Sequence, residues 1–398
     1  MCVRVRTRGV VGFTAVVLVA CSTSMPRSVA TNACGGRAKP LPHPQGPRHL
    51  EYVFPDRAIC VYDIDRGQRL VGGASLPQAS GIRGVAVDPG RALLYVSYGG
   101  DGGPNGSGSL LKYDLLRNRV LWTHSYKTGI DSMALGRHGR TIYMPTGELA
   151  ENGIWTLISA RTGRVFGHID AGAGPHNTIV GLSGEWVYLG GRNERYLVVA
   201  STRTKAVVRR VGPLRSGVRP FTVSGRETIA YTTATGFLGF EVSDLRTGTR
   251  LYTVPIEGFN WNPDSYPASA PSHGISLSPN ERELYVIDGP NSNVHVFDVS
   301  ELPTVRPRQV ANIRIRELSG DERGCAYDCF RDGWLQHSRN GRFVYVGDSG
   351  DVIDTKTRRV VAWLPALRNS RKALEIDWRR GRPVATTTRY GLGYVRQP

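Results

Sequence analysis

The chain has 398 residues, of which 40% are hydrophobic, and carries a formal net charge of +18. A length of this order suggests two or three domains, unless one closed array of repeats uses the whole chain. The basic balance favours anionic partners, but the charges are scattered and form no run of six, so a solvated basic surface is the simplest interpretation.

The N-terminus has the pattern of an export signal. Three arginines within the first eight residues precede an uncharged, mostly apolar run from Val10 to Ala20. This run is shorter than the roughly 20 residues that span a bilayer as a helix, and it fits a signal peptide. It ends in Leu-Val-Ala followed by Cys21, which resembles the lipobox of bacterial lipoproteins. We expect removal of residues 1–20 and anchoring of the protein to the bacterial cell membrane, on its extracytoplasmic side, through lipidated Cys21; ordinary cleavage after Ala30 is the alternative.

Four cysteines follow Cys21 in the chain. Disulfides persist in exported proteins, and we expect Cys325 and Cys329, four residues apart, to form one. Cys34 is expected to be free. A structural zinc site would need a second pair of ligands, which the sequence lacks. Export also argues against nucleic acid as a partner.

A composition change marks the start of the folded part. Residues 22–48 are rich in Ser, Thr, Pro, Gly and Arg, which predicts a disordered tether over 21–50. From Glu51 to the end of the chain, short runs of β-branched and aromatic residues alternate with Gly, Pro, Asp and Asn turns. Stretches with helical periodicity are absent, so we expect one closed all-β domain over 51–398.

One phrase recurs along this domain. Residues 84–96 read Gly-Val-Ala-Val-Asp-Pro-Gly-Arg-Ala-Leu-Leu-Tyr-Val, and residues 274–286 repeat the pattern. Looser copies end at Tyr143, Tyr188, Tyr231 and Tyr345, and a seventh copy, at 373–384, has lost the tyrosine. A second phrase, apolar and closing on Asp, follows each first one, as in Val294–Asp298. Each unit therefore predicts four strands, the content of a propeller blade.

Seven first strands are predicted, beginning near residues 84, 132, 177, 220, 274, 334 and 373. Spare strands at 52–78 precede the first of them. We therefore expect a seven-bladed β-propeller of four-stranded antiparallel blades, in which the N-terminal strands complete the C-terminal blade and remove the open edges. Eight blades would result if both chain ends supplied full sheets.

The paired phrases at 274–286 and 293–299 resemble the YVTN family of bacterial propeller repeats, and related units cover the chain from Glu51. This resemblance implies an extracytoplasmic propeller. Lactonases and the heavy chains of quinoprotein amine dehydrogenases share the blade style. No catalytic motif of either matches residue by residue, so no catalytic residue is assigned from the resemblance.

A candidate site follows from the position just before each first strand, which should ring one mouth of the central channel. Counted back twelve residues from each tyrosine, these positions are polar in six of seven blades. The candidate ligand-binding residues are Arg83, Asp131, His176, Arg219, His273, Asp332 (beside Gly333) and Lys372. Polar groups that converge in a concave site predict a binding site.

Three interpretations of this ring are open. The side chains can satisfy one another and close the channel. They can hold a small anion through Arg83, Arg219 and Lys372. A weaker option is a metal ion on His176, His273 and Asp131. We expect no cofactor.

Two long insertions, Phe259–Ser272 and Arg316–Arg331, should rise over the same mouth, where Trp261 and Tyr266 would cap a ligand or plug the channel. His337 falls inside a first strand and should be packed. The Gly-rich loop beginning at Asp101 is expected to be a flexible hairpin loop.

The leading functional hypothesis is a monomeric, lipid-anchored propeller that binds a small, anionic ligand or a protein partner at its funnel. The alternatives are a lactonase-like hydrolase that uses His176 or His273 as the base, and an envelope scaffold without a ligand. The chain contains no P-loop and no HExxH motif.

Overall fold

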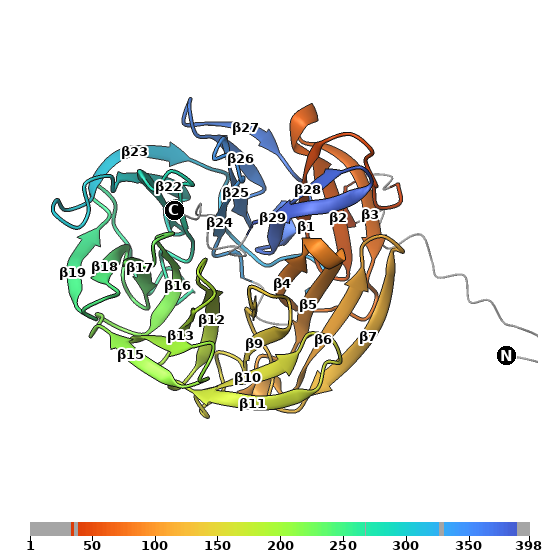
Figure 1. The fold of residues 1–398 in the computed structure, drawn as a ribbon. Coiled ribbons are helices and arrows are strands. Elements are labelled where there is room, and N and C mark those ends of the chain that lie inside the picture. The colour runs from red at the N-terminus through yellow and green to blue at the C-terminus, as the bar shows by residue number, and fades with distance from the viewer. Residues whose placement is uncertain (1–32, 36–38, 267, 326–329, 388–398) are drawn as a thin grey trace, which may run out of the picture.

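The computed structural model describes residues 33–35, 39–266, 268–325 and 330–387. In these ranges, six four-stranded sheets and one five-stranded sheet surround a central axis (Figure 1). The predicted seven-bladed, antiparallel β-propeller is confirmed. No helix within these ranges has the length and apolar character needed to cross a bilayer. The expected signal peptide, residues 1–20, and Cys21 lie outside the described residues.

The first three blades follow one another along the chain. Blade 1 contains β4 (Ile82–Asp88), β5 (Leu93–Gly99), β6 (Gly108–Asp114) and β7 (Arg119–Tyr126). Blade 2 contains β8 (Ala134–Leu135), β9 (Thr141–Pro145), β10 (Ile154–Ser159) and β11 (Val165–Asp170). Blade 3 contains β12 (Pro175–Val180), β13 (Trp186–Gly191), β14 (Leu197–Ser201) and β15 (Val207–Val211).

Blades 4 to 6 repeat this order. Blade 4 contains β16 (Val218–Val223), β17 (Ile229–Ala234), β18 (Gly239–Asp244) and β19 (Arg250–Pro255). Blade 5 contains β20 (Ile275–Leu277), β21 (Glu283–Asp288), β22 (Asn293–Asp298) and β23 (Arg308–Arg314). Blade 6 contains β24 (Trp334–His337), β25 (Phe343–Gly347), β26 (Asp351–Asp354) and β27 (Arg359–Trp363). Each first strand begins within two residues of its predicted position.

Blade 7 joins the two ends of the chain. Its strands are β28 (Ala373–Arg379), β1 (Arg48–Val53), β2 (Ala58–Asp63), β3 (Arg69–Ser75) and β29 (Arg382–Thr386). Strand β1 pairs antiparallel with β28 over six residue pairs. The predicted closure, in which N-terminal strands complete the last blade, is therefore confirmed. Strand β29 pairs with the other side of β28, so this sheet has five strands instead of four (Figure 1).

Short 3-10 turns complete the regular structure in the described ranges: η1 (Ile64–Arg66), η2 (Pro89–Arg91), η3 (Gly103–Asn105) and η4 (Leu367–Asn369). In η2 the side chain of Asp88 accepts a hydrogen bond from the backbone N–H of Arg91. This local bond stabilises the Asp-Pro-Gly turn that the repeat phrase carries.

The recurring tyrosine marks the same place in every blade. Tyr95 on β5 lies opposite Ala86 on β4, and Ala86 comes three residues after Arg83 in the chain. The seventh tyrosine, which seemed lost from the sequence copy at 373–384, is Tyr52 on β1, opposite Leu374. It comes from the other end of the chain because β1 takes the place of the second strand. Its hydroxyl accepts a hydrogen bond from the Trp378 indole N–H, at 3.1 Å.

The hydrophobic cores lie between neighbouring blades. Phe240 of blade 4 and Phe297 of blade 5, for example, meet edge to face with ring centroids 4.9 Å apart. Both are buried, and each contributes on the order of 2 kcal/mol through burial. Because every sheet packs against two others, the ring holds its inner strands in fixed positions around the channel.

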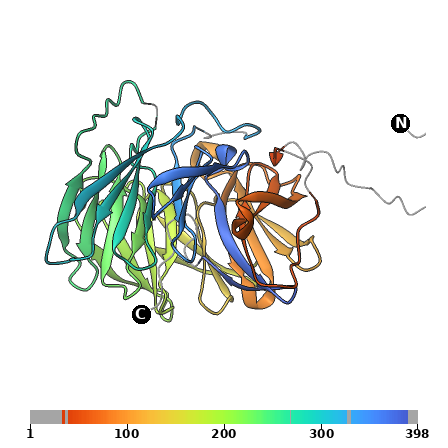
Figure 2. The same ribbon diagram turned by 90° about the horizontal axis from the view of Figure 1, so that it is seen from above.

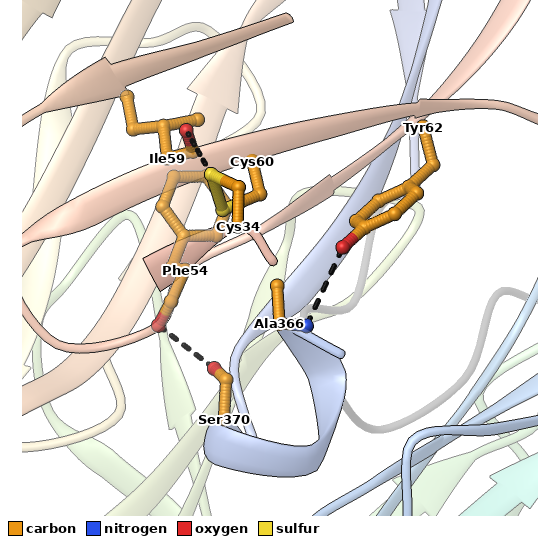
Figure 3. Close-up of a disulfide and its surroundings, with 7 residues drawn as sticks. All are labelled: Cys34, Phe54, Ile59, Cys60, Tyr62, Ala366 and Ser370. Carbon is orange, nitrogen blue, oxygen red and sulfur yellow. Dashed lines mark hydrogen bonds between the residues drawn. A yellow bond between two sulfur atoms is a disulfide. The ribbon is translucent and has the colours of Figure 1, made fainter. Parts of the chain in front are cut away.

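A disulfide fixes the N-terminal segment to blade 7 (Figure 3). Cys34 is bonded to Cys60 on β2, with Cα atoms 5.5 Å apart, so the expectation that Cys34 is free is wrong. Leu41 is also buried against the core of blades 7 and 1, and β1 begins at Arg48. The folded part thus begins before the expected boundary at residue 51.

The expected second disulfide is only partly visible. Cys325 is disulfide-bonded. Cys329 lies outside the described residues, so the pairing of these two cysteines stays a prediction.

Candidate functional site

One mouth of the channel holds all seven candidate residues. Arg83, Asp131, His176, Arg219, His273, Asp332 and Lys372 all line one cavity of about 160 Å³. We call this cavity, with its lining, the polar mouth. Glu148, Arg192 and Arg371 line it as well. Side chains that lie up to 289 residues apart in the chain therefore converge on one opening.

The fold explains this convergence. All first strands run away from the same face, so the residue before each strand lies at the same mouth. In blade 6 the counted position is Gly333, whose φ is +88° and where a Cβ atom would come within 2.1 Å of Ile287. Asp332 supplies the side chain instead. In blade 7, Tyr52 lies opposite Leu374, and the residue three positions before Leu374 is Arg371. Arg371 is the neighbour of the predicted Lys372 in the chain.

Two histidine–aspartate pairs face each other in the polar mouth. The Nδ1 atom of His176 lies 2.8 Å from Oδ2 of Asp131. Nδ1 of His273 lies 3.1 Å from Oδ1 of Asp332 and 3.2 Å from the Gly333 carbonyl oxygen. Because these partners are acceptors, Nδ1 carries the proton in each ring and Nε2 is left with a lone pair when the ring is neutral. The two ring centroids are 6.3 Å apart.

Glu148 is the anionic centre of one side of the polar mouth. Its Oε2 accepts hydrogen bonds from Arg192 and Arg219, both at 3.0 Å. Burial alone would raise the pKa of Glu148, but His176, Arg219, Arg192 and Arg83 hold it well below its usual value. Glu148 is therefore ionised, and its charge holds the arginine side chains in place.

Ser269, on the loop that crosses this side, accepts hydrogen bonds from both Arg219, at 3.0 Å, and Arg192, at 3.4 Å. Two buried atoms here have no hydrogen-bond partner among the described residues: Nε of Arg219 and Nε2 of His176. An unsatisfied buried polar atom is costly unless a ligand or water supplies its partner.

The opposite side is built around Asp332. Arg371 donates a hydrogen bond to Oδ1 of Asp332 at 2.9 Å. Burial would raise the pKa of Asp332, but His273 and Arg371 lower it to about 2. Burial lowers the pKa of His273 and outweighs the opposing effect of Asp332. We conclude that His273 is neutral at pH 7 while Asp332 is ionised and paired with Arg371.

Lys372 completes this side. Its Nζ lies 4.5 Å from the centroid of the Trp334 ring. Burial and the neighbouring charge of Arg371 lower the pKa of Lys372 to about 8. Trp334 also contacts His273, with ring centroids 5.3 Å apart. Burial and the neighbouring cations therefore favour the neutral amine, whereas the face of the Trp334 ring attracts its ammonium form.

Cations outnumber carboxylates among the residues that line the polar mouth. The lining contains four arginines and one lysine, namely Arg83, Arg192, Arg219, Arg371 and Lys372, against the three carboxylates of Asp131, Glu148 and Asp332. Further carboxylates lie behind the lining: Asp101 pairs with Arg83, and Glu322 and Asp348 lie 3.4 and 3.8 Å from Arg371. Many of the cations are therefore paired, as the self-satisfying interpretation predicts, but the surface that faces the cavity keeps an excess of cations. Such an excess at a partly desolvated site favours anions.

Both predicted insertions contribute to this mouth. Their described parts, 256–266, 268–274, 315–325 and 330–333, rise above one face of the ring (Figure 2). They contribute Ala268, Ser269 and Phe330 to the lining. Tyr266 is buried and packs edge-on against Phe330, with centroids 5.6 Å apart. Tyr266 thus helps to hold the two loops together over the cavity.

The weak metal option finds no support in the geometry. Within the ranges that the structure describes, no group of three His, Cys, Asp or Glu residues is arranged to hold a metal ion. His337 is packed as predicted: its Nδ1 lies 2.7 Å from the Ser276 hydroxyl, and its ring meets Tyr285 edge-on. Burial lowers the pKa of His337 to about 3.

Several residues of the site were missed by counting back from the tyrosine. They lie in the loops after the second strands, which end at the same mouth because they run antiparallel to the first strands. Asp101 in blade 1, Glu148 in blade 2 and Arg192 in blade 3 occupy these positions. Counting four to six residues forward from each tyrosine would have found them.

The Gly-rich loop that begins at Asp101 joins β5 to β6 and is the expected hairpin loop. The carboxylate of Asp101 is fully buried and accepts hydrogen bonds from Arg83 at 2.9 Å and from Asn105 at 2.7 Å. Burial, partly opposed by Arg83, raises the pKa of Asp101 to about 6. The Gly-rich loop thus supports the site by holding Arg83.

A second cavity, of about 350 Å³, opens toward the other end of the first strands. Its walls are mainly apolar and include Val87, Leu135, Leu182 and Leu374, with Thr387 after β29. It is larger than the polar mouth, but it has no paired histidines and carboxylates among its lining residues. Of these two cavities, the polar mouth is therefore the one lined by paired histidines and carboxylates.

Comparisons with known proteins define the fold. No family model matches the sequence, and no curated protein matches it. The structure is similar to hydrazine synthase of Kuenenia stuttgartiensis, with a TM-score of 0.54 and 12% sequence identity, over 77% of this chain and 96% of that one. At this identity the likeness concerns the fold alone. Together with the seven sheets, it shows that the chain is a seven-bladed β-propeller.

Proposed function

We propose that this protein binds a small anion at the polar mouth. The observation that carries the proposal is the cation-rich lining of a partly enclosed cavity in which Nε of Arg219 has no hydrogen-bond partner among the described residues. Arginine donors form bidentate hydrogen bonds with carboxylates and phosphates. A bound anion would supply the acceptor that Arg219 lacks.

The size of the cavity restricts the ligand. Pockets for drug-sized ligands usually measure roughly 300–1,000 Å³, whereas the polar mouth encloses about 160 Å³. A carboxylate of a few carbon atoms or a phosphate fits this space. The covering loops, through Ser269 and Phe330, would keep such a ligand away from bulk water.

Thermal unfolding with added anions tests the proposal. Inorganic phosphate and acetate should each raise the melting temperature of the parent protein. In Arg219→Gln the apparent affinity should fall about 10- to 100-fold, since a hydrogen bond to a charged group contributes about 1.5–3 kcal/mol. Arg226→Gln, at an exposed position outside the cavity, is the control for a general loss of charge. Equal responses in both variants and the parent would refute the proposal.

The two histidine–aspartate pairs favour a second candidate function, the hydrolysis of a small ester or lactone. A neutral His273, oriented by Asp332, is suited to accept a proton from water, and the arginines would stabilise the developing oxyanion. His273→Asn should then abolish turnover on a lactone panel while phosphate still stabilises the variant. Absence of turnover by the parent on the panel would remove this candidate.

We propose further that the protein is exported and membrane-anchored through Cys21, as a YVTN-type propeller. The Cys34–Cys60 disulfide supports an oxidising compartment. Mass spectrometry of the membrane-extracted protein should find an acylated Cys21 at the mature N-terminus. Release of the parent into the soluble fraction at the same level as Cys21→Ala would contradict the anchor.

A further inference from the structure

We propose that Lys372 forms an imine with a small 2-oxo acid bound in the polar mouth. This inference rests on the proposed anion site and specifies its ligand class: one carboxylate for the arginines and one adjacent carbonyl for the amine. An anion site alone would need neither a lysine nor an aromatic surface beside it.

Lysine is the rarer cation of this chain. The chain has 45 arginines and only six lysines, so arginine is its ordinary cation. Of the six lysines, Lys372 is the one that lines the polar mouth, where four arginines already provide fixed charge. Arginine stays protonated in proteins and cannot act as a nucleophile, whereas a lysine can lose its proton.

The surroundings of the Lys372 amine also favour its reaction with a carbonyl group. Lys372 is 7% exposed, and its Nζ lies over the Trp334 ring, beside Arg371. Burial and neighbouring cations both favour the neutral, nucleophilic amine, and these are the known means of activating lysines that react with carbonyl groups. The lowered pKa, about 8, leaves a useful fraction of neutral amine at neutral pH.

The cavity offers partners to both the carboxylate and the carbonyl group of a 2-oxo acid. Arg219 has an unpartnered Nε among the described residues, and it offers a donor to the carboxylate. Neutral His273, with its Nδ1 proton held by Asp332 and Gly333, offers Nε2 as a proton acceptor in the same cavity. The loops that cover the mouth limit water, which favours condensation over hydrolysis.

Imine formation needs no reagent besides the Lys372 amine and the 2-oxo acid. The nitrogen lone pair of neutral Lys372 attacks the carbonyl carbon, and the carbonyl oxygen takes a proton to give a carbinolamine. The oxygen then leaves as water with the two hydrogens that came from the amine, and a carbon–nitrogen double bond forms. Protonation of the nitrogen gives the iminium, whose carboxylate stays beside the arginines.

Reductive trapping tests the proposal on the full-length, purified protein. Pyruvate and cyanoborohydride should give one dominant adduct, located at Lys372 by peptide mapping and formed about tenfold or more faster than at any other lysine, because the bound carbonyl is held near the amine. Acetone, which has the carbonyl without the carboxylate, should not show this preference. Lactate, which has the carboxylate without the carbonyl, should slow the trapping of pyruvate.

Lys112 is the matched control inside the chain. It is also largely buried, lies over the Tyr95 and Trp122 rings, and has a pKa lowered by burial, but it is outside the polar mouth. If burial alone determined reactivity, Lys112 would be labelled at a similar rate. Lys372→Met should abolish the fast adduct, and Lys112→Met should leave it unchanged.

The outcomes separate this inference from the proposed function. Adducts spread over the lysines, or a mapped adduct elsewhere, would overturn the imine at Lys372. If Lys372 stays unlabelled while phosphate still raises the melting temperature, the imine is wrong and the anion site stands. If neither phosphate nor pyruvate affects the protein, both proposals fail. Mapping of the parent decides these cases even if Lys372→Met does not fold.

Discussion

Removal of the Cys34–Cys60 disulfide should destabilise the propeller measurably. The two cysteines are separated by 26 residues, and closing a loop of that length in the unfolded chain corresponds to about 3.5 kcal/mol by loop entropy. For a folded domain of about 350 residues, this amounts to a shift of roughly 5 °C in the melting temperature. The loop contains β1, so the disulfide also links the segment before β1 to the strand after it.

The double variant Cys34→Ala/Cys60→Ala should show this shift by calorimetry in oxidising buffer. Both side chains are buried in the parent, so alanine avoids burying a new polar group. Addition of a reductant should bring the parent toward the variant, although it also reduces the disulfide of Cys325. A melting temperature within about 1 °C of the parent, in oxidising buffer, would refute the view that the disulfide fastens the closing blade.

Three further predictions concern buried charges. Glu51 and Glu375 face each other across β1 and β28, and burial raises the pKa of both above 4.5. The free energy of unfolding should therefore fall as the pH rises from about 4.5 to the raised pKa values, by up to about 1.4 kcal/mol per pH unit for each group. Urea unfolding of Glu51→Gln should show a weaker dependence of this free energy on pH, and an unchanged dependence would contradict the prediction. Glu148→Gln should lower the free energy of unfolding by about 3–5 kcal/mol, because it leaves Arg219 without its charged partner. Calorimetry should also find that phosphate stabilises this variant more than the parent. The rate of reductive methylation of Lys372, followed by mass spectrometry, should increase with pH through a midpoint near pH 8. A rate that does not change between pH 7 and 9 would contradict the lowered pKa of Lys372.

The sequence was sufficient for the blade count and for one ring of the site. The reason is local: in blades 1 to 6 the first strand is followed by a turn that contains Gly or Asn and then by the tyrosine, so neighbouring positions can be counted from residues such as Tyr95 or Tyr285. Residues such as Arg83, three positions before the partner of Tyr95, are therefore placed by the short-range register of a hairpin.

Features that depend on contacts between distant parts of the chain were not accessible in this way. Closure of the last blade by N-terminal strands was predicted, but nothing in either local sequence signals that Tyr52 pairs with Leu374. Cys34 lies in a polar, Gly-rich stretch, so its bond to Cys60 depends on how the tether meets blade 7. In blade 7 the count gave Lys372 instead of Arg371, because the copy at 373–384 has no tyrosine from which to count.

The seam between β1 and β28 has a consequence for biosynthesis. Arg371 and Lys372 stand immediately before β28, the strand that unites the two chain ends. Translation therefore produces both side chains only after blades 1 to 6, and the ring cannot close before β28 has been made. The ability to bind the anion and the closure of the ring should therefore appear together during folding. A bound anion should stabilise the closed ring, because ligands stabilise the state that binds them.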